Sequence, residues 1–412
     1  MIRGGVGSLW ETLPPPLKLG AIVALSLVAV EAFSLVESSG GNLEVWGFSL
    51  HIEVDVALLG VTALLILLST PIAAMLGITP AIVELVFGVY LAYRGAEVNE
   101  ALKIISGIGA NMLLFMAGTE IDVGFLKRTA GKALSVAALT LIPAVPVVAY
   151  MTRGAPLEAS ILVFATLTAT SVALTFTLFD AYKVVRARAA QLVLAAAMIL
   201  DVLGMILINV ATAAINPLLI LYGLVILAAF ALQPILPRIT GAPFEMEIRL
   251  VAMALIVLGV LSEVLGIHGV LTSFILGLIV SETVKNRRVL REKIEGLATG
   301  FFTPFFFIVS GMSIGGGVEL LAVLEALALG VVLAASKLGI IYFYIKRFMG
   351  VGRQMAVVAA SGAAPLLTVT IIGAEIGYDL GLIDGRTYSM LIWVVVASSL
   401  TAVMAVKLSY RL

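Results

Sequence analysis

Long apolar stretches, separated by short polar segments, run along most of this chain. A helix that crosses a bilayer needs about 20 mostly apolar residues. Fourteen stretches of roughly this kind predict an all-α polytopic membrane protein with about 13–14 transmembrane helices. The expected spans cover residues 17–36, 55–76, 80–94, 104–123, 132–151, 158–179, 189–214, 216–234, 246–264, 268–283, 299–314, 320–345, 354–376 and 388–408.

A different pattern fills the segment between the first two spans. Residues 43–54 alternate apolar and polar side chains around Gly47. Alternation of period two with a central glycine is typical of a β-hairpin, and we expect a small one on the exterior side.

Composition supports a membrane protein and excludes several function classes. Hydrophobic residues make up 61% of the chain and charged residues 12%, against roughly a quarter charged in soluble proteins. The balance of 25 basic and 25 acidic residues argues against a nucleic-acid partner. Because the chain has no cysteine and two histidines, disulfides, thiol catalysis and Cys- or His-rich metal sites are not expected.

The basic residues predict the orientation of the chain. With a cytoplasmic N-terminus, fourteen spans place the C-terminus on the same side, and 20 of the 25 basic residues then face the cytoplasm. Four face outward, namely Arg94, Lys103, Arg153 and Arg386. The positive-inside rule therefore favours an integral protein of the plasma membrane with both termini cytoplasmic.

Three ionisable residues lie inside predicted spans. Asp201 falls near the middle of an otherwise uncharged span, Lys337 lies similarly deep in the span 320–345, and Glu84 follows Pro80 in a short span. Charges in hydrocarbon are costly and usually mark ion or proton pathways. A permanent Asp201–Lys337 salt bridge is the structural alternative, and Glu84 fits a structural role as well as a functional one. A cation/proton antiporter needs at least one buried carboxylate that can exchange a proton for a small cation.

Two spans carry signs of broken helices. Five hydroxyl residues crowd into residues 166–175, and Pro365 interrupts the span 354–376. Hydroxyls also mediate helix packing, so the hydroxyl cluster at 166–175 indicates either a broken helix or tight packing. Residues 55–214 and 246–408 form two sets of six spans, with 216–234 as connector, and the interrupted span is the fifth in each. Such paired interruptions predict an inverted repeat with its binding site at the breaks.

Several motifs in order resemble the monovalent cation:proton antiporter superfamily, in particular its second branch of sodium/proton and potassium/proton exchangers. The resemblance covers nearly everything from residue 55 onward. It rests on LLFMAGTEID at 113–122, ATSVA at 169–173, AAAMILDVLG at 195–204, GLIVSET at 277–283, FFFIVSGM at 305–312, and the pattern Pro80, Glu84, Gly88.

The resemblance implies a homodimer in which a scaffold holds a mobile core containing two crossing broken helices. The scaffold would comprise residues 55–123 and 246–314, and the core residues 132–214 and 320–412. Residues 1–54 would add a helix and the hairpin, and 215–245 a linker. Asp201 matches the family's shared cation/proton site, Thr170 and Ser171 match its unwound segment, and Lys337 and Glu84 match supporting charges. It implies no cofactor besides transported Na⁺, K⁺ or Li⁺ and H⁺, and we expect no nucleotide-binding regulatory domain.

The chain departs from the family pattern at two places. Leu200 precedes the aspartate where relatives carry Asp, Asn or Gln, so Lys337 lacks its customary neighbour and could pair with Asp201. This departure favours one-for-one electroneutral exchange. Residues 362–364 are Gly-Ala-Ala where many relatives carry Arg-Gly-Glu.

The sequence thus predicts a secondary antiporter that exchanges a monovalent cation for H⁺ by alternating access, with Na⁺ as first candidate and K⁺ as second. A sodium-coupled organic-anion symporter and a non-transporting membrane sensor are the alternatives. An enzyme is not expected, because an intramembrane aspartyl protease needs two facing aspartates and no HExxH zinc motif is present.

Overall fold

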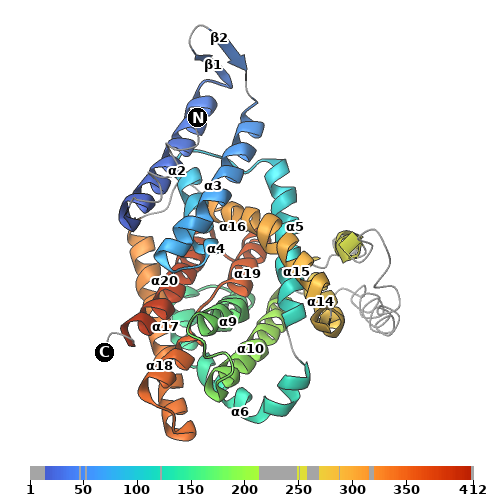
Figure 1. The fold of residues 1–412 in the computed structure, drawn as a ribbon, viewed down its shortest axis with the longest axis vertical. Helices are drawn as coiled ribbons and strands as arrows, with labels where there is room; N and C mark the ends of the chain where they lie inside the picture. Colours follow the sequence, from blue (N-terminus) through green and yellow to red (C-terminus); the bar gives the residue numbers. More distant parts are fainter. Residues whose placement is uncertain are drawn as a thin grey trace, which may run out of the picture. The chain divides into compact units, whose positions relative to one another are not determined.

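The computed structural model describes residues 14–45, 48–51, 53–120, 123–212, 248–249, 251–257, 269–286, 288–314 and 320–409. Over these residues the chain is almost entirely helical (Figure 1). Nine of the described helical segments are long and apolar enough to cross a membrane, and two shorter apolar helices, Pro80–Tyr93 and Thr272–Ser281, accompany them. The predicted all-α polytopic class is confirmed.

The described helices follow the predicted spans closely. Predicted span 216–234 lies outside the described residues, and span 246–264 is described only at 248–249 and 251–257. The long helices are α2 (Pro15–Ser38), α3 (Val54–Leu76), α5 (Glu100–Glu120), α6 (Val123–Leu141), α10 (Arg188–Thr212), α14 (Gly269–Asn286), α17 (Leu320–Met349) and α20 (Gly385–Ser409). Shorter helices are α4 (Pro80–Tyr93), α7 (Ala144–Met151), α8 (Leu157–Thr168), α9 (Val172–Ala181), α15 (Arg288–Leu297), α16 (Thr303–Met312), α18 (Arg353–Ser361) and α19 (Thr368–Asp379), with a π-helical turn at Ala298–Phe302.

The predicted hairpin is present. Strands β1 (Asn42–Val45) and β2 (Phe48–His51) pair antiparallel, with Val45 opposite Phe48, between α2 and α3 (Figure 1). Residues 46 and 47, which include the glycine that suggested the turn, lie outside the described residues.

Two details were not predicted. Helix α6 begins at Val123 rather than at residue 132. Residues 288–297, which lie between the predicted spans 268–283 and 299–314, form the amphipathic helix α15. Its apolar residues Leu290 and Ile294 are spaced by four and are both buried, as expected of a helix with one apolar face.

The chain forms two compact units. The first comprises residues 1–107 and 302–317, and the second residues 108–301 and 318–412. The first is built around the contacts of α2, α3, α4 and α16, with Phe33, Leu65 and Ile308 in its core. The second has a core that includes Phe179 and Ala359. The proposed boundaries between scaffold and core remain a prediction.

Each unit contains one helix crossing that is closed by a pair of glycines. In the first unit, a Cβ on Gly88 of α4 would overlap the carbonyl oxygen of Ile308, and one on Gly311 of α16 would overlap that of Leu85. At both glycines the neighbouring backbone is thus close enough to exclude a side chain. Small residues permit such close packing of membrane helices.

The second unit repeats this crossing with other helices. A Cβ on Gly118 of α5 would overlap the carbonyl oxygen of Phe274, and one on Gly277 of α14 would overlap that of Phe115. In the predicted repeat, α4 and α14 are the second helices of their halves, and α5 and α16 are the third. Each unit therefore pairs the second helix of one half with the third helix of the other, as an inverted repeat requires.

The crossing makes a stability prediction for α5. We expect Gly118→Ala to lower the stability of the detergent-solubilised protein by about 1–3 kcal/mol, because the backbone of α14 has to move away. Gly107→Ala on the same helix is the matched control, since a Cβ there meets nothing within 4 Å. Thermal unfolding of both variants measures the difference, and equal unfolding temperatures would contradict the close crossing.

Candidate ion-binding site

Both predicted breaks are present. Helices α8 and α9 are separated by residues 169–171, and α18 and α19 by residues 362–367. Ser171 begins α9, because its carbonyl accepts the backbone N–H of Thr175 at 3.0 Å and its hydroxyl lies 3.3 Å from the N–H of Leu174. Serine is a preferred residue at this position because its oxygen satisfies a free N–H of the first turn.

The two unwound segments are joined by hydrogen bonds. The backbone N–H of Ser171 donates to the carbonyl of Pro365 at 3.0 Å. The Thr170 hydroxyl lies 3.4 Å from the carbonyl of Ala363. The Thr175 hydroxyl lies 2.7 Å from the carbonyl of Gly362 and 2.8 Å from that of Ser171, so its single proton is shared. Backbone groups released by unwinding are thereby satisfied across the break.

Further contacts fix the second unwound segment on α20. The Ser399 hydroxyl donates to the carbonyl of Leu366 at 3.1 Å, and the Ser398 hydroxyl accepts the N–H of Leu366 at 3.3 Å. At Gly362, a Cβ would overlap the ring of Phe179 and lie 2.7 Å from Cγ2 of Thr175. The small residues of 362–364 are thus matched to a tightly packed crossing.

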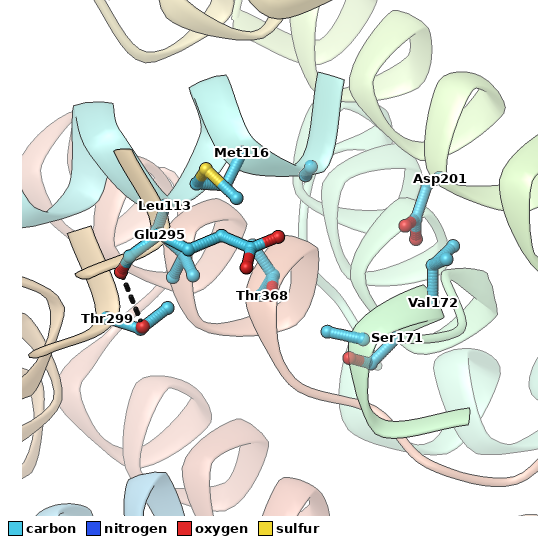
Figure 2. Close-up of a pocket in the computed structure, with 10 residues that line it drawn as sticks. Leu113, Met116, Ser171, Val172, Asp201, Glu295, Thr299 and Thr368 are labelled. Atoms are coloured by element: carbon cyan, nitrogen blue, oxygen red, sulfur yellow. Dashed lines mark hydrogen bonds between the residues drawn. The ribbon is translucent and has the colours of Figure 1, made fainter. Parts of the chain in front are cut away.

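Asp201 lies beside this crossing. It belongs to α10, is 5% exposed, and lines a cavity of about 250 Å³ (Figure 2). The residues that line the cavity are Leu113, Met116, Ala117, Ser171, Val172, Ala173, Asp201, Glu295, Thr299 and Thr368. The structure therefore brings Asp201 and Ser171 to one cavity, whereas Thr170 is directed to Ala363.

The two half-helices give the cavity an electrostatic character. Residues 171–173 are the beginning of α9 and Thr368 is the beginning of α19, and all of them line the cavity with Asp201. A helix N-terminus carries roughly half a positive elementary charge. Two such ends give the wall of the cavity that contains Asp201 a partial positive charge.

Lys337 is placed at the opposite kind of helix end. Its side chain is 0% exposed, and its Nζ donates to the carbonyl of Leu167 at 2.9 Å. Leu167 is the penultimate residue of α8, so Lys337 sits at the negative end of this half-helix. The ion pair with Asp201 considered from the sequence is not the contact that Lys337 makes in the described structure.

Glu84 belongs to the other unit. It is 3% exposed, and its carboxylate accepts a hydrogen bond from the Ser69 hydroxyl of α3 at 2.8 Å. Because Glu84 lies in the first unit and the cavity in the second, its assignment as a supporting charge remains a prediction.

Sequence reasoning missed three polar residues of the cavity. Glu295 lies on α15, Thr299 lies in the π-helical turn after it, and Thr368 is the first residue of α19. The apolar residues Leu290 and Ile294, spaced by four, are the sequence signal that could have revealed α15. Leu200 does not line the cavity: it is 1% exposed and packs in the core of the second unit.

Comparison with known proteins identifies the family. The family described as sodium/hydrogen exchanger, transmembrane, matches residues 60–408. The chain belongs to the sodium/hydrogen exchanger family. It is thus a membrane transporter of the cation/proton antiporter kind rather than an enzyme, and the family works with transported ions and no cofactor.

Individual relatives agree with this assignment. "Probable Na(+)/H(+) antiporter 3" of Methanocaldococcus jannaschii is 28% identical over 325 residues, which cover 74% of this chain and 82% of that protein. The Na(+)/H(+)-K(+) antiporter GerN of Bacillus cereus is 28% identical over 363 residues, covering 82% and 92%. The structure of the sodium proton antiporter MjNhaP1 from Methanocaldococcus jannaschii at pH 8 shares the fold, with a TM-score of 0.61 and 17% identity over 87% of this chain and 98% of that one.

The hydrogen bonds of the crossing can be tested in this family member. Thr175→Val removes the hydroxyl that serves Gly362, and we expect a loss of about 1–3 kcal/mol because a buried carbonyl loses its donor. Thr177→Val is the matched control: its hydroxyl is exposed and bonds within its own helix, to Ala173. Unfolding in detergent should separate the two variants, and equally small losses would count against the crossing bond.

Proposed function

We propose that this chain exchanges Na⁺ for H⁺ across the plasma membrane by alternating access, with Asp201 as the shared binding site and K⁺ as the alternative ion. The observation that carries the proposal is the position of Asp201: a buried carboxylate that lines a cavity beside two half-helices that cross. Such an arrangement places a titratable oxygen ligand where backbone and hydroxyl oxygens are available to a dehydrated cation.

Coupling follows from charge. The Asp201 carboxylate takes either a proton or a cation, and both neutralise it. Moving the bare carboxylate through the low-dielectric interior is costly, so the core changes its accessible side only when one of the two is bound. Opposite fluxes are coupled because a single site serves both ions in turn.

The stoichiometry proposed is one cation for one proton. Leu200 is packed in the core and contributes no second carboxylate beside Asp201. Lys337 is engaged at the end of α8 by a hydrogen bond to Leu167, where it offsets the helix dipole. Both support a cycle in which one negative charge is neutralised once, and hence electroneutral exchange.

The proposed cations are taken from the names of two relatives, which state different ions. The Methanocaldococcus protein is named for Na⁺ and H⁺, and GerN for Na⁺, H⁺ and K⁺. Thr170 and Ser171 are proposed as further oxygen ligands, reached once the hydrogen bonds of the crossing rearrange. A homodimer with both termini in the cytoplasm completes the proposal, on the strength of the family resemblance and the positive-inside count.

The two alternatives receive less support. A symporter for an organic anion needs a basic group facing its substrate, yet the side chains that line the described cavity include two carboxylates and no basic group. A non-transporting sensor does not explain why a carboxylate is buried at a crossing of broken helices.

The test is cation-dependent proton flux in sealed proteoliposomes with Na⁺, K⁺ or Li⁺. We expect saturable flux, with the half-saturating cation concentration rising as the pH falls, because protons compete for Asp201. Asp201→Asn should abolish flux with every cation.

Glu158→Gln provides the control for loss of a carboxylate, because Glu158 is exposed at the start of α8, and it should retain flux. Persistent coupled flux in correctly inserted Asp201→Asn protein would overturn the assignment of the site. Absence of flux in the wild type with every cation would overturn the proposed ion exchange.

A further inference from the structure

Glu295 gives the cavity a second carboxylate. It comes from α15, and its side chain extends into the cavity from the wall opposite Asp201 (Figure 2). Asp201 is 5% exposed, whereas the Glu295 side chain is 37% exposed. One carboxylate thus lies in the interior of the cavity and the other at its more accessible end.

Glu295 is held in place by its own helix. Its backbone carbonyl accepts the Thr299 hydroxyl at 2.7 Å, and Thr299 lines the cavity as well. Its carboxylate accepts the Nε–H of Arg291, one turn earlier, at 2.5 Å. Leu290 and Ile294 of the same helix are buried. Their burial anchors α15 by its apolar face and leaves Glu295 and Thr299 at the cavity.

The Arg291–Glu295 pair is suited to exchange. Both side chains are about half-exposed, at 46% and 37%. Ion pairs exposed to this degree contribute little to stability and are screened by salt. A mobile cation in solution can therefore replace the Arg291 guanidinium at the Glu295 carboxylate without a large loss of stability.

The electrostatics of the cavity interior indicate a role for Glu295. The N-termini of α9 and α19 offset part of the charge of Asp201, which weakens the attraction of the cavity for a cation outside it. A carboxylate at the accessible end restores that attraction, since a positive ion is drawn to a negatively lined cleft.

From this geometry we infer that Glu295 is the entrance carboxylate of the cavity: it receives the monovalent cation before Asp201 does, and Arg291 competes with that cation for it. The inference rests on the proposed antiport at Asp201 and adds a residue that sets apparent affinity. Glu295 binds the cation only on its way to Asp201 in this scheme, so its loss changes how much cation is needed and not whether exchange occurs.

The test is Na⁺-dependent proton flux in proteoliposomes at low ionic strength. Glu295→Gln should raise the half-saturating Na⁺ concentration about threefold to tenfold, because about one unit of nearby charge is lost, and should lower the maximal rate far less than Asp201→Asn does. Arg291→Gln should lower the half-saturating concentration, because the competitor is gone. Both shifts should shrink when choline chloride is added, and Glu295→Asp should recover most of the wild-type value.

Glu292→Gln is the matched control. Glu292 is an exposed carboxylate on the same helix that does not line the cavity, so its variant reports the general surface charge. Protection of the detergent-solubilised protein against thermal unfolding by Na⁺ provides a second readout that does not depend on flux.

Three results would overturn the inference. Equal half-saturating concentrations for Glu295→Gln and Glu292→Gln would reduce the effect to surface charge. Loss of the maximal rate in Glu295→Gln, as in Asp201→Asn, would make Glu295 obligatory. Shifts of the half-saturating concentration in the same direction for Arg291→Gln and Glu295→Gln would make the pair structural. Each of these leaves the antiport at Asp201 standing, whereas a silent wild type would overturn both.

Discussion

Satisfaction of backbone polar groups inside an apolar protein is the constraint on which the rest of the site depends. Unwinding a helix in the interior releases N–H and C=O groups that have no water to bond with, and each unsatisfied group is costly. This protein resolves the problem by placing two breaks against each other. The N–H of Ser171 bonds to Pro365, and the hydroxyl of Thr175 serves Gly362. Once the breaks are stable, their half-helix ends become available for binding charge.

The charges of the second unit follow from those helix ends. The cavity that contains Asp201 is lined by the positive beginnings of α9 and α19, and Lys337 lies at the negative end of α8. Each of the two buried groups thus lies at helix ends whose partial charge is opposite to that of its own ionised form. The proposed exchange at Asp201 builds on this arrangement.

Close packing of helices provides the rigid frame around this site. The glycine pairs Gly88–Gly311 and Gly118–Gly277 bring backbones into direct contact in the two units. Because the two crossings join equivalent helices of the predicted repeat, they are a structural trace of the inverted repeat that leaves no visible similarity in the sequence. Small residues at four positions, rather than a common motif, preserve the arrangement.

Local patterns in the sequence were sufficient to predict the membrane class, most helix positions, the hairpin and the two breaks, and they singled out Asp201 as a candidate site. These are local properties: apolar length defines a span, Pro365 and the hydroxyls of 166–175 mark the breaks, and a charge in an apolar helix stands out alone. Tertiary structure decided the partners. Lys337 bonds to Leu167, 170 residues away, and Glu295 reaches the cavity of Asp201 from a helix that lies between two predicted spans. Such contacts join residues remote in the chain through packing, so no local pattern specifies them.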